Sequence, residues 1–304
     1  DADAELFDVR FTNVGANQGN YILSSTSAVT SIYEYIQPSG GEPQGNYAPV
    51  VRLFAPTKLQ IASLNGKFTP SDKTSVQFEI AASHNDDNLF SSKDQEDDQG
   101  LAALLSVEQV LFQKSKNYRL SVFGNFNFID EDYTSIERLY NVEFARDWNL
   151  LNPSGNQFFL DAGFDFKTNS ASTTQYHFQK LNYTDDFNAS KHVVRSSQIY
   201  DRFRLEAQAS YLESESSILT SEFARAELSA VYDFNQFWSG LRYDMEDNNE
   251  QEVVSETLTA NTQRCSSYEV FSGVGDSTSV YLEAGYRFRE NDSLRNNTLQ
   301  RVNA

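Results

Sequence analysis

The residues of this sequence that could do chemistry are three histidines, one cysteine and several groups of carboxylates. The histidines are His84, His177 and His192, and the cysteine is Cys265. Zinc sites need several Cys or His ligands at short spacings, and no such spacing occurs here. A single cysteine also cannot form an intramolecular disulfide. We therefore expect no zinc site and no cofactor.

An acidic segment carries Asp94, Glu96 and Asp98, whose carboxylate oxygens could bind Ca²⁺. An EF-hand loop has its glycine at about the sixth position. Here Gly100 would stand one position too late. The pattern therefore favours a solvated acidic loop over a calcium site.

His84 lies close to Asp86 and Asp87 at the point where a predicted strand meets a long loop. This group is similar to the His and Asp groups with which omptin-like barrel proteases activate water. The sequence places no second aspartate pair opposite it, and it contains no G-x-S-x-G element of a lipase. We expect a protein that is not an enzyme, with an outer-membrane barrel hydrolase as an alternative.

Charged side chains of both signs lie on alternate positions of several segments, opposite the apolar side chains. Inside a β-barrel this pattern would produce a polar lumen. The lumen would be either a channel whose wall charges select solutes or a space closed by cross-strand ion pairs. The side chains expected to face it are those of Arg202, Arg204, Glu206, Arg225, Glu227, Arg242, Asp244, Glu283, Arg287 and Arg289.

The elements that position these residues show the period of two that is typical of β-strands. Between 202 and 211, for example, Leu205 and Ala207 fall on one face and Glu206 and Gln208 on the other. About twelve strands are predicted. Their ranges are 58–68, 74–84, 101–112, 118–128, 137–150, 157–167, 173–183, 200–212, 221–232, 237–246, 266–273 and 278–289.

Short polar turns are expected at one end of these strands and longer acidic loops at the other. The predicted turns are at 70–72, 114–117, 152–155, 233–236 and 275–277, and this arrangement requires 184–199 to be a single connection. Residues 1–55 are predicted to be a separate β-rich extension, 56–289 the main β-domain and 290–304 a polar, disordered tail. The tetrapeptide Gln-Gly-Asn-Tyr occurs at 18–21 and 44–47. It could present an aromatic ring to a glycan or protein, or serve only as a glycine turn.

The composition limits the class of protein. With 23 Phe and 16 Tyr but one Met, the chain is suited to strands rather than to a helical bundle. Its 43 acidic and 24 basic residues give a net charge of -19, which disfavours nucleic-acid binding. No run of about 18 apolar residues occurs, so a transmembrane helix is excluded.

Two all-β architectures remain: an antiparallel up-and-down transmembrane β-barrel and a soluble β-sandwich. Strands of about ten residues match the length that crosses a bilayer when tilted. Aromatic residues near the segment ends suit the girdles at the two interfaces. These features favour the barrel, with Leu205 and Ala207 in contact with lipid.

The chain also resembles large outer-membrane barrel proteins of Bacteroidota. The resemblance rests on these segments together with residues 88–93, 137–148 and 182–188. It implies a location in the bacterial outer membrane, contact with lipid and possible outer-membrane or surface protein partners, but no particular activity. We expect a non-enzymatic pore, translocation component or surface scaffold. The alternative is a soluble secreted β-sandwich adhesin or carbohydrate-binding module.

The strand count carries a further expectation. If the short turns face the periplasm, the first strand (58–68) begins at the extracellular side. The last strand (278–289) ends at the same side. Self-contained bacterial barrels have an even strand number and short periplasmic turns. We therefore expect either a longer barrel protein or a further strand from residues 1–55, for which 50–54 is the candidate.

Overall fold

The structure is a computed structural model that describes residues 9–26, 31–51, 55–93, 95–115, 117–169, 171–275, 280–295 and 298–303. The chain divides into two compact units. The small unit comprises Asp1–Thr57 and Asp87–Ser91, and the large unit comprises Lys58–Asp86 and Ser92–Ala304.

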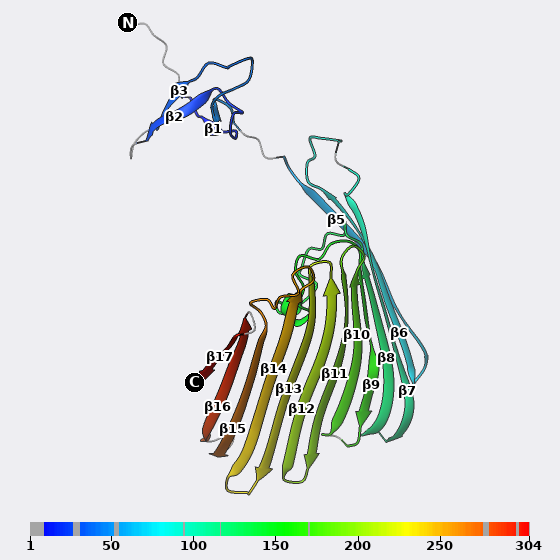
Figure 1. The fold of residues 1–304 in the computed structure, drawn as a ribbon. Coiled ribbons are helices and arrows are strands. Elements are labelled where there is room, and N and C mark those ends of the chain that lie inside the picture. The colour runs from blue at the N-terminus through cyan, green and yellow to red at the C-terminus, as the bar shows by residue number, and fades with distance from the viewer. Residues whose placement is uncertain are drawn as a thin grey trace. The chain divides into compact units, whose positions relative to one another are not determined.

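The large unit is built on one antiparallel sheet in which each strand pairs with its neighbours in sequence (Figure 1). This confirms the expected all-β, up-and-down architecture. Its strands are β5 (Lys58–Ser71), β6 (Thr74–Asp86), β7 (Gln99–Ser115), β8 (Tyr118–Ile129), β9 (Gln157–Lys167), β10 (Thr173–Tyr183), β11 (Phe187–Tyr200), β12 (Phe203–Ser216), β13 (Leu219–Asp233), β14 (Trp238–Glu252), β15 (Gln263–Val274), β16 (Leu282–Arg295) and β17 (Thr298–Asn303).

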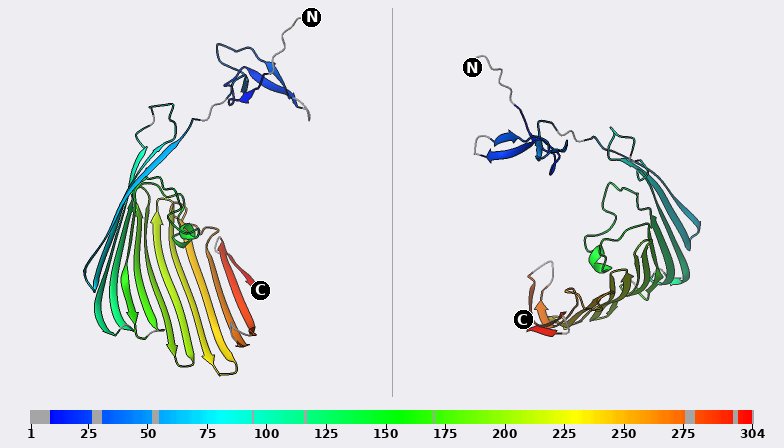
Figure 2. Two further views of the ribbon diagram at one scale, coloured as in Figure 1. Left: turned by 180° about the vertical axis from the view of Figure 1, so that it is seen from behind. Right: turned by 45° about the horizontal axis from the view of Figure 1, so that its top comes forward.

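The sheet is open within the described residues. β5 pairs only with β6, and β17 pairs only with β16. Figure 2 shows the large unit's sheet curved, with the short helix α1 (Phe144–Asp147) on its concave side. We call this concave side the inner face and the opposite side the outer face.

The outer face carries an apolar band across the strands. Cross-strand pairing places Leu205, Ala230, Leu241, Val270 and Tyr286 in one row over five consecutive strands. Three members of this row are strongly exposed: Leu241 at 59%, Val270 at 58% and Tyr286 at 75%. The sheet therefore presents apolar side chains to its surroundings instead of burying them.

The apolar band stops before the strands do. On the outer face of β12, apolar residues run from Phe203 to Tyr211 and are followed by Glu213 and Glu215. Glu213 pairs with Glu222 on β13. Beyond the band the outer face of these two strands is therefore polar.

Two segments differ from the sequence prediction. Residues 137–150 do not form a strand; they belong to a long connection from 130 to 156 that contains α1. Residues 184–199, expected to be a single connection, contain most of strand β11 instead.

The helical turn at α1 explains why 137–150 is not a strand. Phe144 and Trp148 are four positions apart, so one helical turn places both on the same side, where they pack against the sheet.

The turn assignments change accordingly. Residues 152–155, predicted to be a tight turn, lie in the long connection at the opposite end of the sheet. That end also has two short connections, at 184–186 and 217–218. The predicted asymmetry between short turns and long loops is therefore only partial.

The expected irregular tail also contains regular structure, because β16 continues to Arg295 and β17 follows it. The candidate extra strand at 50–54 is not supported. Val50 and Val51 are outside any strand, and 52–54 lie outside the described residues.

The small unit contains a sheet in the order β1-β4-β2-β3. Its strands are β1 (Thr12–Asn13), β2 (Tyr21–Thr26), β3 (Ser31–Tyr35) and β4 (Tyr47–Ala48).

The two Gln-Gly-Asn-Tyr copies pair with each other in this sheet. Gly19 and Gly45 exchange backbone hydrogen bonds of 3.0 and 2.8 Å, and Tyr21 pairs with Tyr47. A Cβ on Gly19 would lie 2.2 Å from the carbonyl oxygen of Tyr47, and one on Gly45 would lie 2.4 Å from that of Tyr21. The glycines are therefore required by close backbone approach, not by a tight turn.

Candidate functional site

All of the predicted lumen residues except Arg202 fall on the inner face of the sheet. Arg225 pairs with Glu246, Glu227 with Asp244, and Arg242 with Glu269. Arg204 and Glu206 on β12 share this face, as do Glu283, Arg287 and Arg289 on β16. Arg202 lies in the turn before β12. The outer face at the same level carries Leu205 and Ala207.

Several of these charges form ion pairs across neighbouring strands. The carboxylate of Glu269 accepts from the Nη2 of Arg287 at 2.6 Å and from the Nη1 of Arg242 at 3.4 Å. The carboxylate of Glu269 therefore lies between two guanidinium groups, one from each neighbouring strand. Arg242 also lies 3.5 Å from Glu283, so four side chains are linked in one network.

The four side chains of this network come from three adjacent strands: Arg242 from β14, Glu269 from β15, and Glu283 and Arg287 from β16. Cross-strand pairing places opposite charges side by side, so each carboxylate meets a guanidinium group instead of another carboxylate. This part of the inner face is therefore held together by alternating charges.

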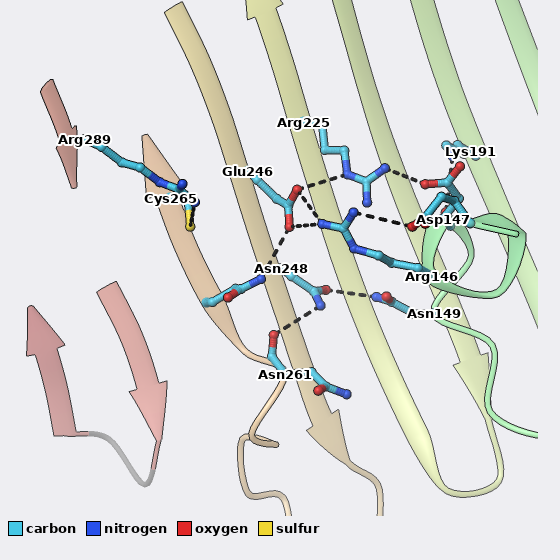
Figure 3. A network of polar contacts seen from close by, with 12 residues as sticks. Arg146, Asp147, Asn149, Lys191, Arg225, Glu246, Asn248, Asn261, Cys265 and Arg289 are labelled. Atoms are coloured by element: carbon cyan, nitrogen blue, oxygen red, sulfur yellow. Dashed lines mark hydrogen bonds and ion pairs between the residues drawn. The ribbon is translucent and has the colours of Figure 1, made fainter. Parts of the chain in front are cut away.

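A second network joins the long connection 130–156 to the inner face (Figure 3). The Nη2 of Arg146 donates to both carboxylate oxygens of Glu246, at 2.9 and 3.0 Å. The Nη1 of Arg225 donates to Asp147 at 2.6 Å, and the Nε of Arg225 lies 3.5 Å from Glu246. Two adjacent residues of α1 are thus paired with opposite charges on β13 and β14.

Further hydrogen bonds extend this second network on both sides of α1. The Nζ of Lys191 donates to the backbone carbonyl of Asp147 at 3.2 Å. The side-chain amide of Asn149 donates to Ser221 and to Asn248, both at 2.9 Å. The connection is therefore bonded to β11, β13 and β14, and not only to the strands that it joins.

An apolar cluster lies beneath the same connection. Trp148 is only 3% exposed and packs with Leu181, Phe187, Leu212 and Phe223 of the inner face. The Nζ of Lys191 lies 5.4 Å from the centre of the Trp148 ring, within the range of a cation–π contact. Burial of Trp148 and the polar contacts of its neighbours hold the connection in one place.

Tyr140 anchors the beginning of the connection. Its ring stacks on Phe144 at 4.0 Å, and its hydroxyl accepts a hydrogen bond from the side-chain amide of Gln157. Burial raises the pKa of the Tyr140 phenol, while its hydrogen bonds with Gln157 and Asn127 act in the opposite direction. The phenol is therefore neutral at physiological pH.

A cavity of about 290 Å³ lies between the connection and the inner face. Tyr140 and Phe144 line it from the connection, and Lys191, Arg195 and Glu227 line it from the strands. Among the described residues, the only hydrogen bond of the Arg195 guanidinium is to Gln208, at 3.3 Å. The inner face can therefore offer both charges and aromatic rings to a solute.

The three histidines do not lie on one face of the sheet. Pairing places His84 and His192 on the outer face and His177 on the inner face, where its Nδ1 lies 3.0 Å from Asp161. In the described part of the chain, no three His, Cys, Asp or Glu side chains form a group that could hold a metal ion. Asp94 of the calcium candidate lies outside that part.

The residues that matter most in the second network were not singled out from the sequence. The sequence pattern predicts a strand over 137–150, which contains Arg146, Asp147 and Trp148. It does not indicate which charged residues pair with Glu246 or Lys191. The useful signal was the spacing of Phe144 and Trp148, since residues four apart share one side of a helix.

Replacement of Arg225 by methionine is expected to weaken docking of the connection. The change leaves Asp147 without its guanidinium partner and removes one of the two guanidinium groups beside Glu246. Urea unfolding in detergent should show a loss of about 1–3 kcal/mol, typical of hydrogen bonds to partly buried charged groups. Arg195→Met is the control and should cost clearly less; equal losses would contradict the assigned role of Arg225.

Comparison with protein-family models, with curated proteins and with solved structures gives no match for this chain. Among the described residues, no helix has the length and apolar character needed to span a membrane.

Proposed function

We propose that the large unit forms the wall of a bacterial outer-membrane β-barrel that is not an enzyme. In this proposal the outer face contacts lipid and the inner face lines a polar lumen. The observation that carries it is the exposed apolar band of the outer face, which is bounded by carboxylates at Glu213, Glu215 and Glu222. A face of this kind is unfavourable in water and favourable in a bilayer.

The height of the band suits a membrane. From Phe203 to Tyr211 there are eight residue steps, or about 26 Å along the strand at ~3.3 Å per step. At a tilt of ~40° this length covers about 20 Å, compared with about 25 Å for the apolar band of outer-membrane barrels. The polar continuation beyond Tyr211 would then lie outside the hydrocarbon.

The connection 130–156, which is docked on the inner face, supports a role in controlling the passage of solutes or in presenting a surface to partner proteins. It places Arg146, Asp147 and Tyr140 over the inner face, where they would narrow a lumen next to the cavity that Arg195 and Glu227 line. The proposed roles are a pore, a translocation component or a scaffold for outer-membrane or surface partners. A soluble β-sandwich adhesin or carbohydrate-binding module is the alternative, and it would need a second layer over the apolar band.

The open edges add a requirement to this proposal. Among the described residues β5 has a partner on one side only. In hydrocarbon, each unpaired backbone group of such an edge costs several kcal/mol. We propose that in the membrane further amphipathic strands pair with β5 and close the wall.

Extraction and gel mobility test the proposal. A membrane barrel should remain in the outer-membrane fraction after a urea wash, should require detergent for extraction and should migrate differently on gels before and after boiling. Protein that is soluble without detergent would contradict it and would favour the sandwich.

A further inference from the structure

One face of the small unit's sheet is formed by aromatic side chains. Pairing of Tyr21 with both Tyr35 and Tyr47 places these three on the same side of the sheet. The ring of Phe11 lies 4.7 Å from that of Tyr21 and 4.4 Å from that of Tyr33. The Tyr33 ring in turn lies 5.0 Å from the Tyr47 ring, so the five rings form a continuous aromatic face.

The aromatic face is accessible. Tyr35 is 55% exposed, and the other four rings are half-buried, mainly against one another. Among the described residues, the buried hydrophobic side chains all belong to the large unit. An accessible group of aromatic rings is a common feature of binding surfaces.

The five rings of the aromatic face carry no charge, although the chain as a whole carries a net charge of -19. The charged side chains of the described residues between 9 and 51 are Arg10, Glu34 and Glu42. Glu34 pairs with Ile22 and alternates with Tyr33 and Tyr35, so it lies on the opposite face. The aromatic face therefore suits a neutral ligand better than an ionic one.

The size of the aromatic face argues against a folded protein as its ligand. Four strands at ~4.8 Å spacing and a longest strand of six residues at ~3.3 Å give a face of at most roughly 400 Å². A stable protein interface buries about 800 Å² on each partner. A narrow ligand that crosses a few rings fits this area.

We propose that the aromatic face, formed by Phe11, Tyr21, Tyr33, Tyr35 and Tyr47, binds a neutral polysaccharide. The pyranose rings of such a chain have apolar C–H faces and hydroxyl groups at their edges. Tyrosine offers an apolar ring for the first and a hydroxyl group for the second. This inference does not depend on whether the large unit lies in a membrane.

Affinity electrophoresis of the detergent-solubilised protein, with both units present, tests this inference. Native gels would contain mixed-linkage β-glucan, dextran or mannan as neutral probes and alginate as the acidic probe. At least one neutral probe should retard the protein more than alginate does. No retardation by any neutral probe, or stronger retardation by alginate, would overturn the proposal.

Two substitutions on β3 provide matched variants. Tyr35→Ala should weaken binding to the retarding probe by about five- to tenfold, because it removes the most exposed ring of the aromatic face. Ile32→Ala changes a side chain of the same exposure, 56%, on the opposite face and should alter binding less than about twofold. Equal losses for the two variants would overturn the proposal.

Discussion

Trp148→Ala is expected to release the connection 130–156 from the inner face. The indole is 3% exposed, contacts Phe144 and Phe159 and lies beneath Lys191. Removing a buried Trp side chain costs about 3–5 kcal/mol. The polar contacts of Arg146 and Asp147 are already present with Trp148 in place, so they do not compensate for this loss.

Hydrogen exchange of the backbone amides in 130–156 measures this release. A loss of 3 kcal/mol or more corresponds to a rise of roughly 100-fold in the opening equilibrium. Leu151→Ala is the control, because Leu151 belongs to the same connection but is 59% exposed. Its effect should stay within about 0.5 kcal/mol. Unchanged exchange in the Trp148 variant would show that the polar contacts alone hold the connection.

Leu205→Arg is expected to destabilise the protein in a bilayer by about 2–4 kcal/mol if Leu205 lies near the midplane. Leu205 lies on the outer face of β12, in the row that also contains Leu241 and Tyr286. An arginine there would place a charge in hydrocarbon. Ala207→Arg, two positions along the same face, should give a similar loss.

Gln208→Arg is the matched control for this pair of variants. Gln208 lies on the same strand but on the inner face, where it accepts a hydrogen bond from Arg195. Its replacement should cost much less, because the new charge would meet a polar surface. Unfolding in liposomes compares the three variants, and equal penalties on both faces would contradict the assigned orientation.

The sequence predicted most of the large sheet because most of its strands carry apolar residues at every second position. The interval 203–211 is an example, and the structure places it in β12. β11 was missed because its outer face carries Asn188, Ser190 and His192, so that the apolar alternation is absent there. A strand whose outer face is polar looks like a loop when period two is the only criterion.

The opposite error occurred at 137–150. Val142, Phe144 and Trp148 are residues with high strand propensity, but Phe144 and Trp148 pack against the sheet from a helical turn. The predicted strand at 137–150 does not form, and β11 forms where no strand was predicted. The number of strands from β5 to β16 therefore still equals the expected twelve. The agreement in number therefore conceals two errors of placement.

The inner-face charges could be predicted from alternation, but their partners could not. Alternation assigns Arg225 and Arg242 to one face, whereas register decides that Arg225 meets Glu246 and that Arg242 meets Glu269. Register depends on turn lengths and on packing over the whole sheet. The contribution of Arg146 and Asp147 depends in addition on a long connection folding back across several strands.

Nitroxide labels placed singly along 203–211, in a Cys265→Ser background and in liposomes, test the central claim most directly. The claim predicts that labels at 203, 205, 207, 209 and 211 collide with oxygen dissolved in the bilayer. Labels at 204, 206, 208 and 210 should instead collide with a water-soluble nickel complex. A uniform response along the strand, or the absence of any oxygen-accessible position, would contradict the placement of the outer face in lipid.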